Sequence, residues 1–450
     1  AALLQPFHAA AEDGVAALDR GDFQRAIDEL LPVARVLPTY DDAAARLADA
    51  RTQRDQSLAD ALTAAQSRHD WLGAESALRS LVAGGSDDAP AKLAALYRQH
   101  GPLILGRDHG LWLTGLDGAD DRLITDRAPV VWPSWSPDRA QIAFFTYDPN
   151  DPSGKISLCL VNVDGSGFRT LVGDVSAHAP PVWSPDSRRI AYTSFAAYDP
   201  TNDDGPISVR YYDLPTNREI DVSSDRFPLA FNPAWSPDGS ELAFVAKRRV
   251  AGERPQESSG DVMVARLGRD GFANLTEGRV RDVWSVAWNP VSDRMLLYSL
   301  FGQAWYEAPK TALRLLDPRT DALSLVDRGD QTLGMPQWSP DGADYAYTRG
   351  DHTLVVADTH GARALPLPVD LSGDLTWSPD SKALLALPVD SSQPTQLVEI
   401  DRGDAARAAP LVYDADRPFY APPQWAPITP PPPGGPPTVG GVGFDAAARP

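Results

Sequence analysis

A short motif that begins with tryptophan recurs along most of the chain and constrains its fold more than any other feature. Five copies read Trp-Ser-Pro-Asp, and two shortened copies keep the Trp and the Pro. The tryptophans of the seven copies are Trp135, Trp183, Trp235, Trp288, Trp338, Trp377 and Trp425. Their spacings of 48, 52, 53, 50, 39 and 48 residues match the length of one four-stranded propeller blade. The repeat therefore predicts a seven-bladed β-propeller.

The residues around each motif predict its place in a blade. Ser, Pro and Asp are residues that a tight turn accepts, and an apolar strand such as residues 141–144 follows. We expect the motif to form the turn between the first and second strands, with its Trp packed between blades. Because five aspartates recur in equivalent turns, they indicate construction of the fold and not catalysis.

Both ends of the β-rich region contribute to the predicted closure of the ring. The copy at Trp425 supplies one strand before the chain becomes proline-rich, which leaves the seventh blade three strands short. Three strand-like segments, residues 103–105, 111–117 and 122–124, precede the first motif. We expect them to pair with the strand at Trp425, because this pairing would close the ring and cover two sheet edges.

The run of motifs resembles the propeller repeats of the TolB family, which also occur in tricorn protease and in prolyl-oligopeptidase-type enzymes. The resemblance covers residues 103–427 and implies a location in a bacterial cell envelope. TolB itself has six blades behind a small α/β domain, whereas seven blades behind a helical domain are expected here. The partners of TolB are therefore not carried over.

Residues 1–100 are predicted to form a helical domain. Phe23, Ile27 and Leu30 recur at helical spacing. The segment that Gly21-Asp22-Phe23 opens and Pro38 closes resembles the second helix of a tetratricopeptide repeat, and a weaker copy begins at His69. Such hairpins could cradle a peptide, or they could serve as a spacer or a dimerisation element.

The expected fold class is therefore α + β and multidomain. Its parts are a tetratricopeptide-like helical domain over 1–100, a seven-bladed propeller over 103–427 and a Pro/Gly-rich tail over 428–450. A net charge of −20 argues against nucleic acid as a partner. No apolar stretch is long enough to span a membrane, so an anchor would lie outside this chain.

Cellular location is inferred indirectly. The single cysteine, Cys159, excludes an internal disulfide, and the sequence shows no signal peptide. The TolB resemblance implies an extracytoplasmic location, periplasmic or at the cell surface, and the low cysteine content allows it. A start at Ala1 without Met also suits an ectodomain processed from a longer polypeptide.

Candidate residues for catalysis and metal binding are few. A Gly-x-Ser-x-Gly elbow, which a peptidase of the prolyl-oligopeptidase type needs, is absent. We therefore predict no enzyme activity and no cofactor. Two acidic hairpins are candidates for binding Ca²⁺, which prefers hard oxygen ligands, although Asp is also a common turn former. Their candidate ligands are Asp148, Asp151, Asp199, Asp203 and Asp204.

Loop length is the feature that points to function. Four consecutive blades have long insertions between their second and third strands, at residues 146–155, 195–206, 247–260 and 299–310. These insertions carry residue types that are enriched at protein interfaces: Tyr147, Tyr198, Arg248, Arg249, Trp305 and Tyr306. The sequence therefore predicts a non-catalytic protein–protein interaction or assembly module of an envelope complex.

One alternative stays open. The chain could be a propeller enzyme, or a carbohydrate- or metal-binding protein, that uses the mouth of the central channel. The residues expected at that mouth are His178, Phe231, Trp284 and Tyr420.

Overall fold

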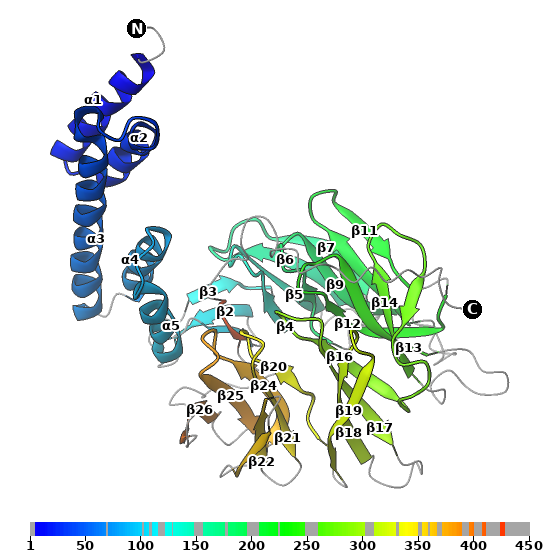
Figure 1. The fold of residues 1–450 in the computed structure, drawn as a ribbon. Coiled ribbons are helices and arrows are strands. Elements are labelled where there is room, and N and C mark those ends of the chain that lie inside the picture. The colour runs from blue at the N-terminus through cyan, green and yellow to red at the C-terminus, as the bar shows by residue number, and fades with distance from the viewer. Residues whose placement is uncertain are drawn as a thin grey trace. The chain divides into compact units, whose positions relative to one another are not determined.

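The chain divides into two compact units, Ala1–Gln99 and His100–Pro450. Figure 1 presents the computed structural model as a ribbon. It describes residues 5–68, 71–100, 103–107, 110–115, 122–127, 129–147, 156–175, 179–195, 207–223, 226–247, 260–301, 310–329, 333–349, 353–358, 361–366, 371–388, 396–399, 407–410 and 424–427.

The first unit is helical. Its elements are α1 Gln5–Asp19, α2 Phe23–Val36, a 3-10 turn Tyr40–Asp42, α3 Ala43–Ser67, α4 Trp71–Ala83 and α5 Ala89–His100. Helices α1 and α2, α2 and α3, and α3 and α4 are in contact. Among the described residues, no helix combines the length and apolar character that crossing a membrane requires.

Helix α2 begins and ends where the sequence predicted. It starts at Phe23, and the Asp22 side chain caps it by accepting a hydrogen bond from the backbone N–H of Arg25. It ends at Val36, two residues before Pro38. Its buried residues include Ile27 and Leu30, which belong to a core shared with α3. The apolar face therefore accounts for the packing of the helix.

The second unit is a β-propeller, a ring of twisted sheets. Its described residues form five four-stranded sheets and one eight-stranded sheet. The strands in the first half of the unit are β1 Leu103–Arg107, β2 Gly110–Thr114, β3 Arg122–Thr125, β4 Val130–Trp135, β5 Gln141–Tyr147, β6 Ile156–Asn162, β7 Arg169–Val175, β8 Val182–Trp183, β9 Arg189–Phe195, β10 Ile207–Asp213, β11 Arg218–Asp221, β12 Leu229–Trp235, β13 Glu241–Lys247 and β14 Gly260–Arg266.

The strands in the second half of the unit are β15 Phe272–Asn274, β16 Val283–Trp288, β17 Met295–Phe301, β18 Lys310–Asp317, β19 Ala322–Gly329, β20 Gln337–Trp338, β21 Tyr345–Arg349, β22 Thr353–Ala357, β23 Ala362–Pro366, β24 Leu371–Trp377, β25 Ala383–Pro388, β26 Gln396–Glu399, β27 Arg407–Pro410 and β28 Gln424–Trp425. In this half, β16–β19, β20–β23 and β24–β27 each form a four-stranded antiparallel sheet. The eight-stranded sheet contains β8–β11 and β12–β15, joined by one parallel bridge between Ile207 and Leu229.

The first and last parts of this unit share one sheet. Leu103 of β1 is opposite Trp425 of β28, and Ile104 is opposite Gln424. The pairing predicted from the sequence is confirmed, and the sheet has the order β28-β1-β2-β3. The first strands of the sheets contact one another in series from β4 to β28, and β28 contacts β4 in turn.

Each complete motif forms the predicted turn between the first and second strands. In the first copy, Ser136 Oγ donates a hydrogen bond of 2.6 Å to Asp138 and accepts one of 2.9 Å from the backbone N–H of Gln141. Asp138 also accepts a hydrogen bond from the N–H of Ala140. The Ser–Asp bond is repeated at Asp186, Asp238, Asp341 and Asp380. These aspartates stabilise turns, as expected from their repetition.

The motif tryptophans link neighbouring first strands by a hydrogen bond from the indole N–H to a backbone carbonyl. The Trp135 indole donates to Gln424 at 3.2 Å, which connects β4 to β28. Four further bonds repeat this arrangement: Trp183 to Ser134, Trp235 to Val182, Trp338 to Ala287 and Trp377 to Gln337. Trp288 differs, because its buried Nε1 has no hydrogen-bond partner among the residues that the structure describes.

Candidate binding site

A small cluster of residues lies where β12 and β16 begin. Leu229, the first residue of β12, is opposite Lys247, the last residue of β13, and Lys247 is opposite Gly260, the first residue of β14. The insertion at 248–259 therefore leaves the sheet at this end. A Cβ on Gly260 would lie 2.6 Å from the carbonyl oxygen of Val283, so β16 begins beside it. The cluster thus lies at the strand ends that carry the long insertions.

Two irregular strands bring Phe231 and Trp284 together. Trp284 lies in a bulge of β16, and Asn232 lies in a bulge of β12 with a φ of 53°. The Asn232 side chain donates a 2.7 Å hydrogen bond from Nδ2 to the carbonyl oxygen of Trp284. The rings of Phe231 and Trp284 meet edge to face, with centroids 5.4 Å apart. Bulges redirect side chains, and Trp284 is 40% exposed.

Lys247 completes a group that we call the aromatic corner, which consists of Phe231, Lys247 and Trp284. The Lys247 Nζ lies 5.5 Å from the centroid of the Trp284 ring, within the range of a cation–π contact. Burial lowers the pKa of Lys247, and the charge of Asp282 acts in the opposite direction. The residue is only 5% exposed, so the corner presents the indole to solvent and keeps the cation beneath it.

The aromatic corner offers a surface suited to binding. An exposed indole offers a flat apolar face for stacking, and its N–H can donate a hydrogen bond. The perpendicular Phe231 ring and the bonded Asn232 hold Trp284 from two sides. A preformed aromatic surface of this kind loses little conformational entropy on binding a partner.

The predicted site residues fall partly inside the described region. Of the channel-mouth residues, Phe231 and Trp284 are brought together, and His178 and Tyr420 lie outside the described residues. Tyr147, the last residue of β5, is half-buried. The other predicted partner-binding residues lie outside the described residues: Tyr198, Arg248, Arg249, Trp305 and Tyr306.

The metal candidates also lie outside the described residues, namely Asp148, Asp151, Asp199, Asp203 and Asp204. Within the described part of the chain, no group of three or more His, Cys, Asp or Glu side chains could hold a metal ion. Cys159 is buried in the core, and this burial raises the pKa of its thiol. It therefore has the environment of a structural cysteine.

Sequence reasoning did not identify Asn232 and Lys247 as parts of the site. A usable signal existed for Asn232, because Asn tolerates a positive φ and here precedes Pro233 in a strand that would otherwise be regular. Lys247 gave no such signal, since a Lys at the end of a strand is ordinarily exposed. Its cation–π contact is with Trp284, which lies on another strand, β16.

Comparisons with known proteins give matches among solved structures alone. No protein-family profile matches the sequence, and no curated protein matches it. Among solved structures, the propeller domain of the trilobed protease from Pyrococcus furiosus is similar with a TM-score of 0.49 and 14% identity, over 68% of this chain and 87% of that one. An oligogalacturonate lyase from Vibrio parahaemolyticus is similar with a TM-score of 0.47 and 13% identity, over 64% and 88%.

TolB structures are among the matches as well. TolB from Acinetobacter baumannii is similar with a TM-score of 0.42 and 16% identity, over 63% of this chain and 69% of that one. The predicted resemblance to TolB-like β-propellers is thus confirmed. The matches also include a prolyl endopeptidase and oligogalacturonate lyases. At these identities the similarity concerns the fold alone.

Proposed function

We propose that the β unit is a closed seven-bladed propeller and that it serves as a protein-binding module. Dividing the eight-stranded sheet at its parallel bridge gives two blades, which make seven with the five four-stranded sheets. The pairing of β1 with β28 and the bond from Trp135 to Gln424 support closure.

The observation that carries the binding proposal is the exposure of Trp284 in the aromatic corner. Trp, Tyr and Arg dominate the binding energy of protein interfaces, and they do so best where neighbouring residues hold them in place. Trp284 is 40% exposed and is held by Phe231 and Asn232. It also lies at the end of the sheet from which insertion 248–259, with its three arginines, departs. We therefore expect a protein partner to cover this face.

The test places a photo-cross-linking amino acid at Arg281, an exposed residue close to Trp284 in the sequence, once with Trp284 present and once together with Trp284→Ala. We expect the first variant to join covalently to one protein of an envelope fraction, and the second to lose capture of that same protein. Leu325→Ala is the matched control, because Leu325 is 56% exposed on β19 and lies outside the corner. Capture that survives Trp284→Ala would contradict the proposal.

A carbohydrate ligand is the second candidate. Its support is that two predicted channel-mouth residues, Phe231 and Trp284, form an aromatic pair, and an exposed indole face stacks well on a sugar ring. Glycan binding that Trp284→Ala abolishes, with no protein captured, would favour this candidate. An enzyme would in addition require turnover of the bound glycan.

We propose that α1–α4 form tetratricopeptide-like hairpins, since α2 and α4 begin at Phe23 and Trp71, each preceded by an Asp in the sequence. An extracytoplasmic location is proposed from the sequence resemblance to TolB, and cell fractionation would test it. The proposal includes no cofactor and no nucleic acid.

A further inference from the structure

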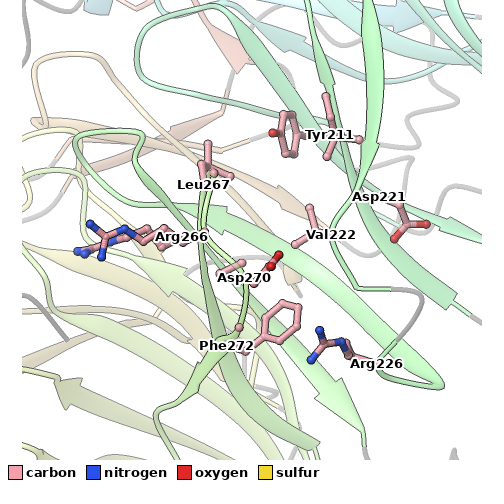
Figure 2. Close-up of a pocket in the computed structure, with 13 residues that line it drawn as sticks. Tyr211, Asp221, Val222, Arg226, Arg266, Leu267, Asp270 and Phe272 are labelled. Carbon is pink, nitrogen blue, oxygen red and sulfur yellow. The ribbon is translucent and has the colours of Figure 1, made fainter. Parts of the chain in front are cut away.

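A cleft of about 500 Å³ lies between the end of β11 and the turn that joins β14 to β15 (Figure 2). This volume is within the usual range for a pocket that binds a small molecule. Two half-buried aromatic residues line it and are anchored by rings of the core. Phe272 packs against Phe227 at a centroid distance of 5.2 Å, and Tyr211 packs against Trp235 at 5.8 Å. The cleft therefore has an aromatic lining that the core holds in place.

The hydroxyl group of Tyr211 is a polar element of this lining. Among the residues that the structure describes, it has no hydrogen-bond partner. Burial raises the pKa of Tyr211, so the phenol stays protonated at neutral pH. Its O–H can therefore donate a hydrogen bond to a ligand.

Two charged residues of the lining are neutralised by ion pairs. Arg266 pairs with Glu241 at 2.9 Å, and Asp221 pairs with Arg210 at 3.1 Å. Arg266 accordingly points away from the centre in Figure 2. These two residues therefore add little net charge to the cleft.

Three further charged residues of the lining, Arg226, Arg269 and Asp270, are exposed. Within the described part of the chain, none of their side chains forms an ion pair or a hydrogen bond. Figure 2 places Asp270 near the centre. The cleft thus carries two such cations and one such anion, on a chain whose net charge is −20. This local excess of positive charge favours an anionic ligand at a surface that otherwise repels one.

The extent of the cleft favours a small molecule over a segment of a protein. Thirteen residues line the cleft, whereas a stable protein interface takes roughly 20 to 30 residues from each partner. The cleft is also separate from the aromatic corner. It includes Arg266 at the end of β14, and the corner lies beside Gly260 at the start of that strand.

We propose that the cleft binds a small aromatic acid, in which a carboxylate or sulfonate is attached to a flat apolar body. The acidic group meets the guanidinium of Arg226 or Arg269 in a charge-assisted hydrogen bond. The aromatic body of the ligand packs against Phe272, and a polar atom of the ligand accepts a hydrogen bond from the hydroxyl of Tyr211.

The test titrates the full chain with anilinonaphthalene sulfonate, an aromatic sulfonate whose fluorescence rises in an apolar site. We expect saturable binding that naphthoate, an aromatic carboxylate, displaces. The double variant Arg226→Gln, Arg269→Gln should bind the probe about tenfold more weakly, because two exposed charge pairs are lost. Arg188→Gln is the matched control, since Arg188 is exposed in a turn outside the cleft.

Two single variants test the roles of the other lining groups. Asp270→Asn removes a carboxylate that repels the anion, so we expect it to bind the probe about twofold more tightly. A ligand that brought a cation into the cleft would respond to this change in the opposite direction. Tyr211→Phe removes only the hydroxyl, and we expect it to weaken binding about fivefold.

The neutral analogue phenylnaphthylamine has the same aromatic body without the sulfonate, so the wild type and the double variant should bind it equally. Circular dichroism checks that each variant is folded. Trp284→Ala should bind the sulfonate normally, which separates this inference from the proposed function. Absence of saturable binding, equal binding of the sulfonate by the folded double variant, weaker binding by Asp270→Asn, or loss of binding in Trp284→Ala would each overturn the inference.

Discussion

At the scale of single residues, the indole N–H distinguishes tryptophans that look equivalent in the repeat. The Trp377 indole donates to the carbonyl of Gln337 at 3.2 Å, whereas the buried Nε1 of Trp288 has no partner among the described residues. The shortened motif at Trp288 continues with Asn289, whose side chain instead donates to the carbonyl of Gly342 at 2.8 Å. The repeat therefore does not assign the same energetic role to each Trp.

This difference predicts unequal effects of one chemical change. Trp→Phe keeps an aromatic ring but removes the N–H donor, so Trp377→Phe leaves the Gln337 carbonyl without this bond. We expect Trp377→Phe to lower the free energy of unfolding by about 1 kcal/mol more than Trp288→Phe does, because only the first substitution removes a hydrogen bond. Urea denaturation of both variants measures the difference. Equal losses would show that the indole bonds contribute nothing to stability.

The sequence predicted the motif turns but not the bonds between them. Ser, Pro and Asp favour a turn by local chemistry, which is why the position of each turn could be predicted. The hydroxyl of Ser187 accepts a hydrogen bond from the N–H of Asp138, in the turn of the preceding sheet. That bond depends on how two sheets approach each other, which local propensity does not encode. The contact between Lys247 and Trp284 was missed for the same reason.

At the scale of elements, one ionic cluster joins two neighbouring sheets. Asp327 of β19 accepts hydrogen bonds from Tyr347 and Arg349 of β21, at 2.6 Å and 2.8 Å. Burial alone would raise the pKa of Asp327, but these bonds outweigh burial and lower it. The carboxylate is therefore stabilised by folding.

The lowered pKa predicts how stability depends on pH. Because the pKa of Asp327 is lower in the folded state, its stabilising contribution is complete above about pH 5 and is lost as the pH falls through the folded pKa. We expect Asp327→Asn to lower the free energy of unfolding by about 2 kcal/mol at pH 7. The variant should also lose less stability than the wild type on acidification.

Denaturation curves from pH 7 to acidic pH measure both effects. Asp270→Asn is the control, because Asp270 is exposed and forms no ion pair within the described residues. An Asp327 variant that matches wild-type stability at pH 7, or that has the same pH dependence, would contradict the prediction.

At the scale of the whole molecule, the sheet that contains β28 holds the two ends of the β unit together. Trp425 packs with Leu103, Ala383 and Leu385 in a small buried cluster. We expect a chain shortened to residue 423, which lacks β28, to unfold at a lower denaturant concentration and to aggregate. The reason is that the edge of β1 and the apolar side chains beneath Trp425 become exposed.

A chain shortened to residue 427 is the matched control, because it keeps β28 and loses only the proline-rich segment. We expect it to unfold like the full chain, and analytical ultracentrifugation would detect aggregation in either variant. If both shortened chains have the same stability and stay monomeric, β28 does not stabilise the propeller.

The sequence allowed the architecture to be predicted further than the binding surface. Counting one strand at the last motif and three strand-like segments before the first motif was enough to predict that β28 pairs with β1, because each blade needs four strands. The bridge between Ile207 and Leu229 joins two adjoining sheets, and no residue pattern marked it.

The pairing of β1 with β28 also sets an order of events during synthesis. Leu103 leaves the ribosome roughly three hundred residues before Trp425, which at ordinary translation rates is a delay on the order of tens of seconds. Throughout that interval β1 has one edge without its native neighbour. Two nascent chains on the same messenger RNA could then exchange their last strands and form an intertwined dimer. We therefore expect slower translation of the final repeat to lower the share of the protein that emerges as a monomer.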